Sequence, residues 1–347
     1  MKVDLFDYDL PPELIAQKPV EPRDHSRLLV VDPVNETMED HVFYELLDHL
    51  HSGDVMVVNH SKVIPARLYG TRESGGSVEL LLLKRLEIDI WECLVKPGRK
   101  VKPGTRLQFG TELRGTCLQV ESDGNQVIQF YYEGVFEELL DRLGEMPLPP
   151  YITDRLSQSE QNRYQTVYRK EGESVAAPTA GLHFTEELLQ KIQDKGVIVT
   201  SVMLNVGLGT FRPVKTSRVE DHQMHEEYFE ITQETADIIN LAKAQGRRVI
   251  GVGTTTIRVL ESSWRKHGMI LKESAWTDIF ITPGYQFQVL DGLVTNFHLP
   301  QSTLIMLISA FMGRELTLKV YQEAIDRKYR FFSFGDAMFI QRGVRHV

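Results

Sequence analysis

The chain contains little cysteine and no long hydrophobic run. Cys93 and Cys117 are its only thiols, and their spacing matches no cysteine-based metal site. We interpret them as reduced, buried thiols of a cytoplasmic protein. The longest apolar segment, residues 304–311, is far shorter than the roughly 20 residues of a membrane-spanning helix. The N-terminal segment is acidic and contains Pro11 and Pro12, unlike a secretory signal or a transit peptide. We therefore expect a cytoplasmic protein with no membrane segment.

Positive charge is scarce as well. The chain has 39 Lys and Arg residues against 48 Asp and Glu, a net charge of −9, which argues against a protein that coats nucleic acid indiscriminately. One segment departs from this balance, because residues 94–110 contain no acid. Its basic residues are Lys96, Arg99, Lys100, Lys102 and Arg106. Such a segment either contacts nucleic-acid phosphates or is only a solvated hairpin.

Residues 62–149 have the pattern of a small β-domain. Short apolar segments follow one another with Gly and Asp-Gly turns and no helix between them, which is typical of an antiparallel barrel or sandwich. We predict strands at 66–71, 78–85, 90–96, 106–109, 113–121 and 127–131, and a short helix at 135–143. The proline cluster at 147–150 then indicates a linker.

The flanking residues alternate between helix and strand patterns. We predict strands at 28–31, 54–59, 197–203, 248–252, 278–281 and 337–341, and helices at 43–50, 185–195, 234–244, 256–266, 303–312 and 315–328. No internal repeat or low-complexity segment interrupts this pattern. We therefore predict an α/β main domain, a mixed sheet with flanking helices, formed by 1–61 and 150–347. A small antiparallel β-barrel domain, 62–149, is inserted into it.

Residues 178–185, Pro-Thr-Ala-Gly-Leu-His-Phe-Thr, bring His183 to the start of a predicted helix. Thr185 is the expected N-cap, and Glu186 and Glu187 suit the positive end of the helix dipole. A titratable ring beside free backbone N–H groups can hold an anion and move a proton. Many histidines at this position only cap or pack, so both interpretations stay open.

Two glycine-containing loops follow predicted strands. Residues 251–256, Gly-Val-Gly-Thr-Thr-Thr, lie before a helix whose N-terminus and three hydroxyls suit a carboxylate, phosphate or ribose. This loop lacks the Walker A ending and the third glycine of the dinucleotide fingerprint. Residues 205–213 supply Arg212 as a bidentate partner for an anion. A plain turn is the alternative for both loops.

Other titratable residues lie in polar segments. Residues 220–227 contain His222 and His225, but no third ligand stands at helical spacing, so we favour a carboxylate-oriented base over a metal site. A solvated acidic turn is the other alternative. Asn296 and His298 form a polar run before a helix that Ser302 is expected to cap. Asp278 opens a predicted strand.

Together these segments resemble one family, the S-adenosylmethionine:tRNA ribosyltransferase-isomerases of queuosine biosynthesis. The resemblance runs over nearly the whole chain and in order, which makes it far more specific than any single motif. Its blocks are FDYDLPPELIAQ at 6–17, PRDHSR at 22–27, NHSKVIPAR at 59–67, APTAGLHFT at 177–185, LGTFRP at 208–213, HEE at 225–227, GVGTTT at 251–256 and TNFHLP at 295–300.

The resemblance implies an α/β domain that carries an inserted β-barrel, in agreement with the pattern above. It also implies that the ribosyl part of S-adenosylmethionine is transferred to 7-aminomethyl-7-deazaguanine at the tRNA wobble position and isomerised. Epoxyqueuosine-tRNA forms, and adenine and methionine leave. S-Adenosylmethionine is thus a ribosyl-donor substrate, tRNA is the partner, and no step needs a metal. We expect a monomer.

This chemistry assigns expected roles. A base near neutrality must remove a proton beside the sulfonium, and His183, His222 and His298 are the candidates. A donor to adenine assists its departure, either protonated Asp278 or one of the histidines. The expected contacts to S-adenosylmethionine are Thr179, Gly181, Arg212, Gly253, Thr254, Thr255, Thr256 and Asn296. The expected RNA contacts are Arg67, Lys96, Arg99, Lys100 and Lys102, with a Tyr or Phe stacking on the splayed wobble base.

Two other functional classes remain as alternatives. A non-catalytic RNA-binding protein would use the barrel and the basic segment, and would bind tRNA without consuming S-adenosylmethionine. It leaves the polar segments of the α/β domain unexplained. A metal-dependent hydrolase built on residues 220–227 would lose its activity to chelators.

Overall fold

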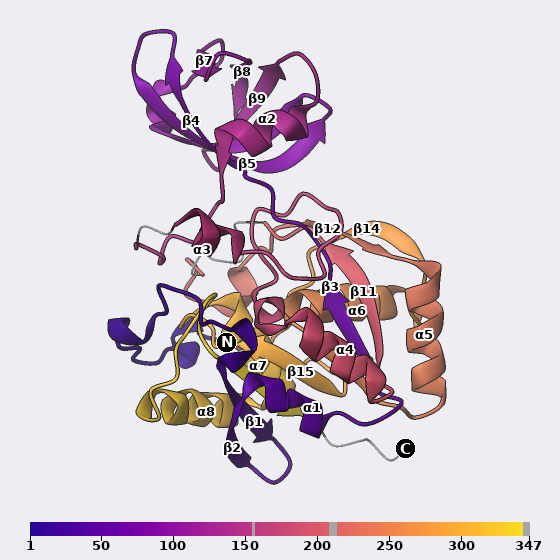
Figure 1. Ribbon diagram of the computed structural model, residues 1–347. Helices are drawn as coiled ribbons and strands as arrows, with labels where there is room; N and C mark the ends of the chain where they lie inside the picture. Colours follow the sequence, from indigo (N-terminus) through magenta and orange to yellow (C-terminus); the bar gives the residue numbers. More distant parts are fainter. Residues whose placement is uncertain (155–156, 208–213, 343–347) are drawn as a thin grey trace. The chain divides into compact units, whose positions relative to one another are not determined.

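The structure is a computed structural model that describes residues 1–154, 157–207 and 214–342 (Figure 1). The chain forms two compact units. One contains Met1–Lys62, Pro150–Gly172 and the described residues from Ala177 onward, and the other contains Val63–Pro149 with Glu173–Ala176. We refer to them as the α/β unit and the barrel unit.

The α/β unit is built on a mixed sheet of nine strands. Their order is β14-β12-β11-β3-β13-β15-β16-β1-β2. The neighbours β11, β3, β13 and β15 run parallel, as do β16 and β1, whereas the remaining pairs are antiparallel. The strands are β1 Arg27–Asp32, β2 Thr37–Val42, β3 Val55–Asn59, β11 Ile198–Leu204, β12 Glu227–Ile231, β13 Val249–Val252, β14 Glu273–Thr277, β15 Gly292–Asn296 and β16 Ala337–Gln341.

Helices cover both faces of this sheet, as expected for central strands that are buried on both faces. The sequence Val-Met-Val-Val-Asn of β3 is buried at every position. Met56 and Val58 face a core that also contains Leu188 and Ile192 of α4, while α5 and α6 pack against β3, β11 and β13. The helices are α1 Leu46–His49, α3 Gln158–Asn162, α4 Glu186–Asp194, α5 Gln233–Ala244, α6 Thr254–His267, α7 Thr303–Met312 and α8 Arg314–Asp326.

The barrel unit is a closed antiparallel barrel. Its strands pair in the order β10-β4-β5-β6-β9-β8-β7, and an additional β4–β7 pairing closes the ring. Alternate side chains point inward, so that Trp91, Cys93 and Val95 of β6 are buried. Both cysteines are buried free thiols. The elements are β4 Arg67–Arg72, β5 Ser77–Glu87, β6 Ile90–Lys96, β7 Arg106–Phe109, β8 Leu113–Val120, β9 Gln126–Tyr131, α2 Phe136–Leu143 and β10 Gly144–Glu145.

The predicted fold class is confirmed, and so are all six barrel strands to within about two residues. The strand predicted at 278–281 is wrong. The strand in this region is β14, Glu273–Thr277. At its end the Thr277 hydroxyl oxygen accepts a hydrogen bond from the Ile279 amide over 3.1 Å. Its sequence Glu-Ser-Ala-Trp-Thr is too polar to predict from hydrophobicity, whereas Ile279 and Ile281 are buried without being in a strand. Strands β2, β12 and β15 were not predicted.

Candidate active site

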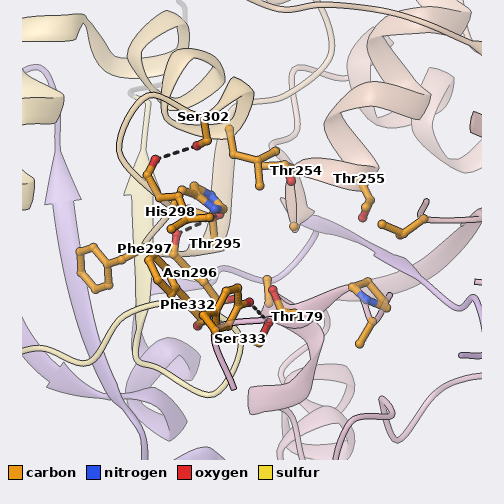
Figure 2. A pocket seen from close by; sticks show the side chains of 18 residues that line it. Thr179, Thr254, Thr255, Thr295, Asn296, Phe297, His298, Ser302, Phe332 and Ser333 are labelled. Atoms are coloured by element: carbon orange, nitrogen blue, oxygen red, sulfur yellow. Dashed lines mark hydrogen bonds between the residues drawn. The ribbon is translucent and has the colours of Figure 1, made fainter. Parts of the chain in front are cut away.

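A cavity of the α/β unit opens at the carboxyl ends of two neighbouring parallel strands, β13 and β15 (Figure 2). This is the edge of an open α/β sheet where ligands commonly bind. Figure 2 shows Thr254 and Thr255 on one wall and Asn296, His298 and Ser302 opposite them. The other labelled lining residues are Thr179, Thr295, Phe297, Phe332 and Ser333.

The first turn of α6 forms one wall. Gly253 precedes this helix with φ +87° and ψ 154°, a conformation that suits glycine alone, and no side chain caps the helix. Thr256 turns inward, and its hydroxyl donates to the Gly253 carbonyl over 2.7 Å. The Thr255 hydroxyl is buried and has no hydrogen-bond partner in the described structure, although Thr255 lines the cavity. Uncapped N–H groups and a free hydroxyl therefore meet at this wall, where they favour an acceptor or an anion.

Asn296, at the end of β15, is held in one amide orientation. Its Nδ2 donates to the Phe332 carbonyl over 3.1 Å and to His183 Nε2 over 3.0 Å. A carbonyl oxygen only accepts, so it fixes which amide atom is the nitrogen. The opposite atom, Oδ1, is buried and has no partner among the described residues. The cavity wall thus carries an acceptor that awaits a donor, since a buried carbonyl without a hydrogen bond costs free energy.

The same hydrogen bond fixes the tautomer of the neutral His183 ring. Nε2 accepts from Asn296, so the proton of the neutral ring lies on Nδ1, which is 2.6 Å from Ser26 Oγ. The ring stacks on Phe43, 4.9 Å between centroids, and only 3% of the residue is exposed. Burial, reinforced by Arg330, Arg23 and Arg163, lowers the pKa of His183 to about 3. His183 is therefore a neutral ring with both nitrogens hydrogen-bonded.

His298 differs from His183 because it lines the cavity itself. Its Nε2 lies 2.9 Å from the Thr295 hydroxyl, a group that can either donate or accept. Its main-chain N–H donates to Tyr321 Oη over 3.1 Å, and its carbonyl accepts from Tyr8 Oη. Burial lowers the pKa of His298 to about 3, so this ring is neutral as well.

The loop before α7 is shaped by Ser302. Its hydroxyl accepts a hydrogen bond from the Ile305 amide over 3.3 Å, which confirms Ser302 as the predicted N-cap. The same hydroxyl donates to the Leu299 carbonyl over 2.7 Å. The other predicted cap is also present, because the Thr185 hydroxyl accepts from the Leu188 amide over 3.0 Å. Both histidines thus stand close to capped helix starts, as the sequence indicated.

Several residues predicted for the site lie elsewhere. His222 packs edge-to-face on Phe280 at 5.3 Å, Asp278 is exposed, and neither lines the cavity. Gly181 and Thr256 also stay outside its lining. An added Cβ at Gly181 would lie 2.0 Å from the Tyr168 hydroxyl, so glycine serves close packing there. Arg212 lies outside the described residues.

Glu227, in the acidic segment 220–227, has a buried ionic partner. Its Oε2 accepts from Arg258 Nη1, and its Oε1 accepts from the Gly207 amide over 2.9 Å. Both side chains are less than one-tenth exposed. The carboxylate therefore ties β12, α6 and the end of the 205–207 segment together. Among the described residues, no group of three His, Cys, Asp or Glu side chains is placed to hold a metal ion.

The residues predicted to contact RNA belong to the barrel unit. Lys96, Arg99, Lys100 and Lys102 are all exposed, around the short 3-10 helix Gly98–Lys100. Arg67 is partly buried and pairs with Glu79 over 2.5 Å. No helix in the described ranges is long and apolar enough to cross a membrane.

Some residues at the cavity were not predicted to belong to the site. Ser26 touches His183, while Tyr151 and Ser333 line the cavity and lie 2.5 Å apart between their hydroxyl oxygens. Ser26 belongs to the PRDHSR block at 22–27, so the family resemblance could have marked it as a site residue. Residues 332–333 come from a loop before the last strand, and nothing in their local sequence distinguishes them from core residues.

Comparisons with known proteins agree with one another. A family model described as "Queuosine biosynthesis protein" matches residues 3–340. The chain is 56% identical to the S-adenosylmethionine:tRNA ribosyltransferase-isomerase of Fusobacterium nucleatum subsp. nucleatum, covering 96% of this chain and 95% of that protein. It is also 56% identical to the protein of the same name from Desulfitobacterium hafniense, over 98% of this chain and 100% of the relative. The crystal structure of S-adenosylmethionine tRNA ribosyltransferase from Thermotoga maritima is similar, with 41% identity, a TM-score of 0.56 and coverage of 97% and 99% of the two chains.

Proposed function

We propose that this chain, which belongs to the queuosine biosynthesis protein family, is an S-adenosylmethionine:tRNA ribosyltransferase-isomerase. It transfers the ribosyl moiety of S-adenosylmethionine to 7-aminomethyl-7-deazaguanine at the tRNA wobble position and isomerises it. The products are epoxyqueuosine-tRNA, adenine and methionine. S-Adenosylmethionine is consumed as a ribosyl donor.

Family membership carries this proposal, and the cavity of the α/β unit supports it, because two polar atoms at its walls have no partner among the described residues. Asn296 Oδ1 is an acceptor that suits an N–H donor, such as the adenine amino group or the methionine ammonium. The Thr255 hydroxyl and the uncapped start of α6 suit the ribose hydroxyls or the carboxylate. We assign S-adenosylmethionine to this cavity, with Thr179, Gly253 and Thr254 completing the wall.

His183 and His298 take different roles in this proposal. His298 lines the cavity, and its Nε2 contacts the Thr295 hydroxyl, so we assign it the proton transfer. Its pKa of about 3 is below the near-neutral value expected for such a base, and the neutral ring that results is the form that accepts a proton. Both nitrogens of His183 are engaged by Ser26 and Asn296. We therefore assign His183 a positioning role, in which it holds the Asn296 amide toward the substrate. His222 and Asp278 have no part in this assignment.

Exposed lysines and arginines of the barrel unit support the RNA half of the proposal. Lys96, Arg99, Lys100 and Lys102 are free to approach phosphates, whereas Arg67 is already paired with Glu79. The wobble base must leave the anticodon stack to reach a buried reaction centre, which makes backbone contacts necessary to hold the loop.

The proposed activity is tested by incubating the protein with S-adenosylmethionine and tRNA that carries 7-aminomethyl-7-deazaguanine. We expect adenine to be released and the tRNA to gain the mass of the transferred ribosyl group. Methyl transfer to the tRNA, or no reaction, would contradict the proposal.

The assignment of the histidines is tested by single-turnover rates of His298→Gln and His183→Gln. Removal of a proton-transfer group costs about 10²- to 10⁴-fold in rate, so His298→Gln should fall at least about 100-fold. His183→Gln should mainly weaken the apparent affinity for S-adenosylmethionine. Full single-turnover activity of His298→Gln would rule out its role as the base.

A further inference from the structure

A second, smaller cavity of the α/β unit adjoins the first. Ser333 lines both cavities, and the Asn296–His183 hydrogen bond connects their walls. Three arginines are among the residues that line the second cavity, Arg23, Arg163 and Arg330. Its volume is about 20 Å³, which is room for one water-sized oxygen. None of the described residues that line it is acidic.

The three guanidinium groups are not equally compensated. Arg163 pairs with Glu21, whose side chain is 70% exposed, so solvent screens this pair. Arg330 pairs with buried Asp336 over 3.2 Å. Among the described residues, the Arg23 side chain donates only to main-chain oxygens, Gln165 O at 3.0 Å and Leu182 O at 3.4 Å. Within the described ranges no carboxylate lies at ion-pair distance from Arg23.

This arrangement leaves positive charge and unused donors beside a small cavity. Arg163 Nε is buried without a partner in the described part of the chain, and the hydrogen bonds of the Arg23 guanidinium there all come from Nη1. Guanidinium groups bind carboxylates and phosphates through paired N–H donors. His183 at the cavity wall is neutral, so it adds no charge of its own. A single anionic oxygen in this space would meet several donors at once.

We propose that this cavity is an oxyanion site, with Arg23 as its principal ligand and Arg163 and Arg330 completing it. The anion is an oxygen of a carboxylate or a phosphate group. If the proposed function holds, two substrates offer such an oxygen, a phosphodiester of the RNA and the carboxylate of S-adenosylmethionine. The site is then a specificity element beside the reaction cavity.

A first experiment tests the site with inorganic phosphate alone, without either substrate. The thermal midpoint of the full chain is measured in phosphate and in chloride at equal ionic strength. We expect phosphate to stabilise the wild type, and Arg23→Met to abolish this shift. Arg265→Met, which removes an exposed arginine of α6 away from the cavity, is the control that should keep it. A folded Arg23→Met protein with an unchanged shift, or a wild type without one, would overturn the proposal.

A second experiment identifies the source of the oxyanion. Dissociation constants of wild type, Arg23→Met and Arg265→Met are measured separately for S-adenosylmethionine and for an anticodon stem–loop carrying 7-aminomethyl-7-deazaguanine. If an RNA phosphate fills the site, Arg23→Met weakens RNA binding about tenfold and lowers its salt slope by about 1. If the carboxylate fills it, binding of S-adenosylmethionine weakens instead. Unchanged constants for both ligands would refute the role of the site as a specificity element.

The two proposals fail separately. A wild-type protein that consumes no S-adenosylmethionine disproves the proposed function, while the phosphate experiment still decides whether the oxyanion site exists. Conversely, the enzyme can be active while its Arg23→Met variant binds phosphate and both substrates as the wild type does. That result would support the proposed function and disprove the oxyanion site.

Discussion

Individual side chains of the reaction cavity separate into those that satisfy the fold and those that await a ligand. Thr255 and Thr256 are adjacent, and both are largely buried. The Thr256 hydroxyl donates to main-chain carbonyls, whereas the Thr255 hydroxyl has no protein partner in the described structure. The same distinction applies within one residue at Asn296, whose amino group is satisfied and whose Oδ1 is not.

This contrast predicts opposite phenotypes for two isosteric substitutions. Thr256→Val should destabilise the fold by about 1–2 kcal/mol, because it removes a buried hydrogen-bonded hydroxyl. Thr255→Val should leave stability nearly unchanged and weaken the affinity for S-adenosylmethionine about tenfold. Denaturant unfolding and equilibrium binding measure the two effects. Thr255→Val with wild-type affinity would show that the hydroxyl does not contact the ligand.

The buried histidines predict a pH dependence of stability. The pKa values of His183 and His298 are lowered by burial to about 3, below the ordinary value of 6.5. The unfolded chain therefore binds more protons between pH 6.5 and 3, and stability falls as the pH decreases through this range. The decrease is on the order of 1.4 kcal/mol per pH unit for each histidine.

Unfolding midpoints between pH 7 and 5 measure this slope. His183→Gln should reduce the slope by about one proton. An equal slope in His183→Gln would show that this ring is not held neutral.

At the scale of elements, the site is assembled by the ends of strands and the starts of helices. β13 leads into α6 through Gly253, and β15 leads through His298 to the Ser302 cap of α7. Strands β13 and β15 are parallel neighbours, so their carboxyl ends lie at the same edge of the sheet. Two loops that are about 40 residues apart in sequence are thereby brought to one cavity.

The turn at Gly253 is the backbone feature on which this junction depends. Its φ of +87° with ψ 154° is nearly restricted to glycine, so Gly253→Ala should cost about 1–3 kcal/mol. The strain falls on the first turn of α6, and we expect activity to fall with stability. Gly268→Ala, at the left-handed C-cap of the same helix with φ +70°, is a matched control that should reduce stability but keep activity. Wild-type activity in Gly253→Ala would contradict the importance of this turn.

The elements also show where the sequence pattern was informative. Strands of the barrel and the capped helices α4 and α7 carry strong local signals, namely period-two apolarity and Thr or Ser N-caps. β14 carries a weak signal, because its polar residues pair with β12 while the apolar Ile279 and Ile281 beyond it pack outside the sheet. Pairing partners decide such a strand, and they are distant in sequence.

At the scale of the whole molecule, RNA recognition must work against a net charge of −9. A negatively charged chain gains RNA affinity only from local groups of cations, so few residues should control the salt dependence. We predict that changing Lys96, Arg99, Lys100 and Lys102 together to Gln weakens tRNA binding more at low than at high salt. The slope of log Kd against log salt should fall by about 1 for each phosphate that the variant no longer neutralises.

The matched control for this prediction replaces basic residues on the α/β unit. Lys266 and Arg265 at the end of α6 are exposed and lie outside both cavities. Their replacement by Gln removes two positive charges without touching the basic segment of the barrel unit. An equal change in slope per removed charge in the two sets would indicate a general charge effect rather than a defined RNA interface.

The fold class, the antiparallel barrel strands, the helix caps and the family can be predicted from the sequence, because these depend on local periodicity, on turn chemistry and on ordered blocks of residues. Which polar residues share a cavity depends on the folded chain. Hydrogen-bond partners and burial come from segments far apart in the chain. Ser26, His183 and Asn296 meet from three different segments, whereas His222 and Asp278 lie outside the lining of the reaction cavity. The state of a histidine depends on those neighbours, so its type and position in the sequence could mark it as a candidate but could not assign its role.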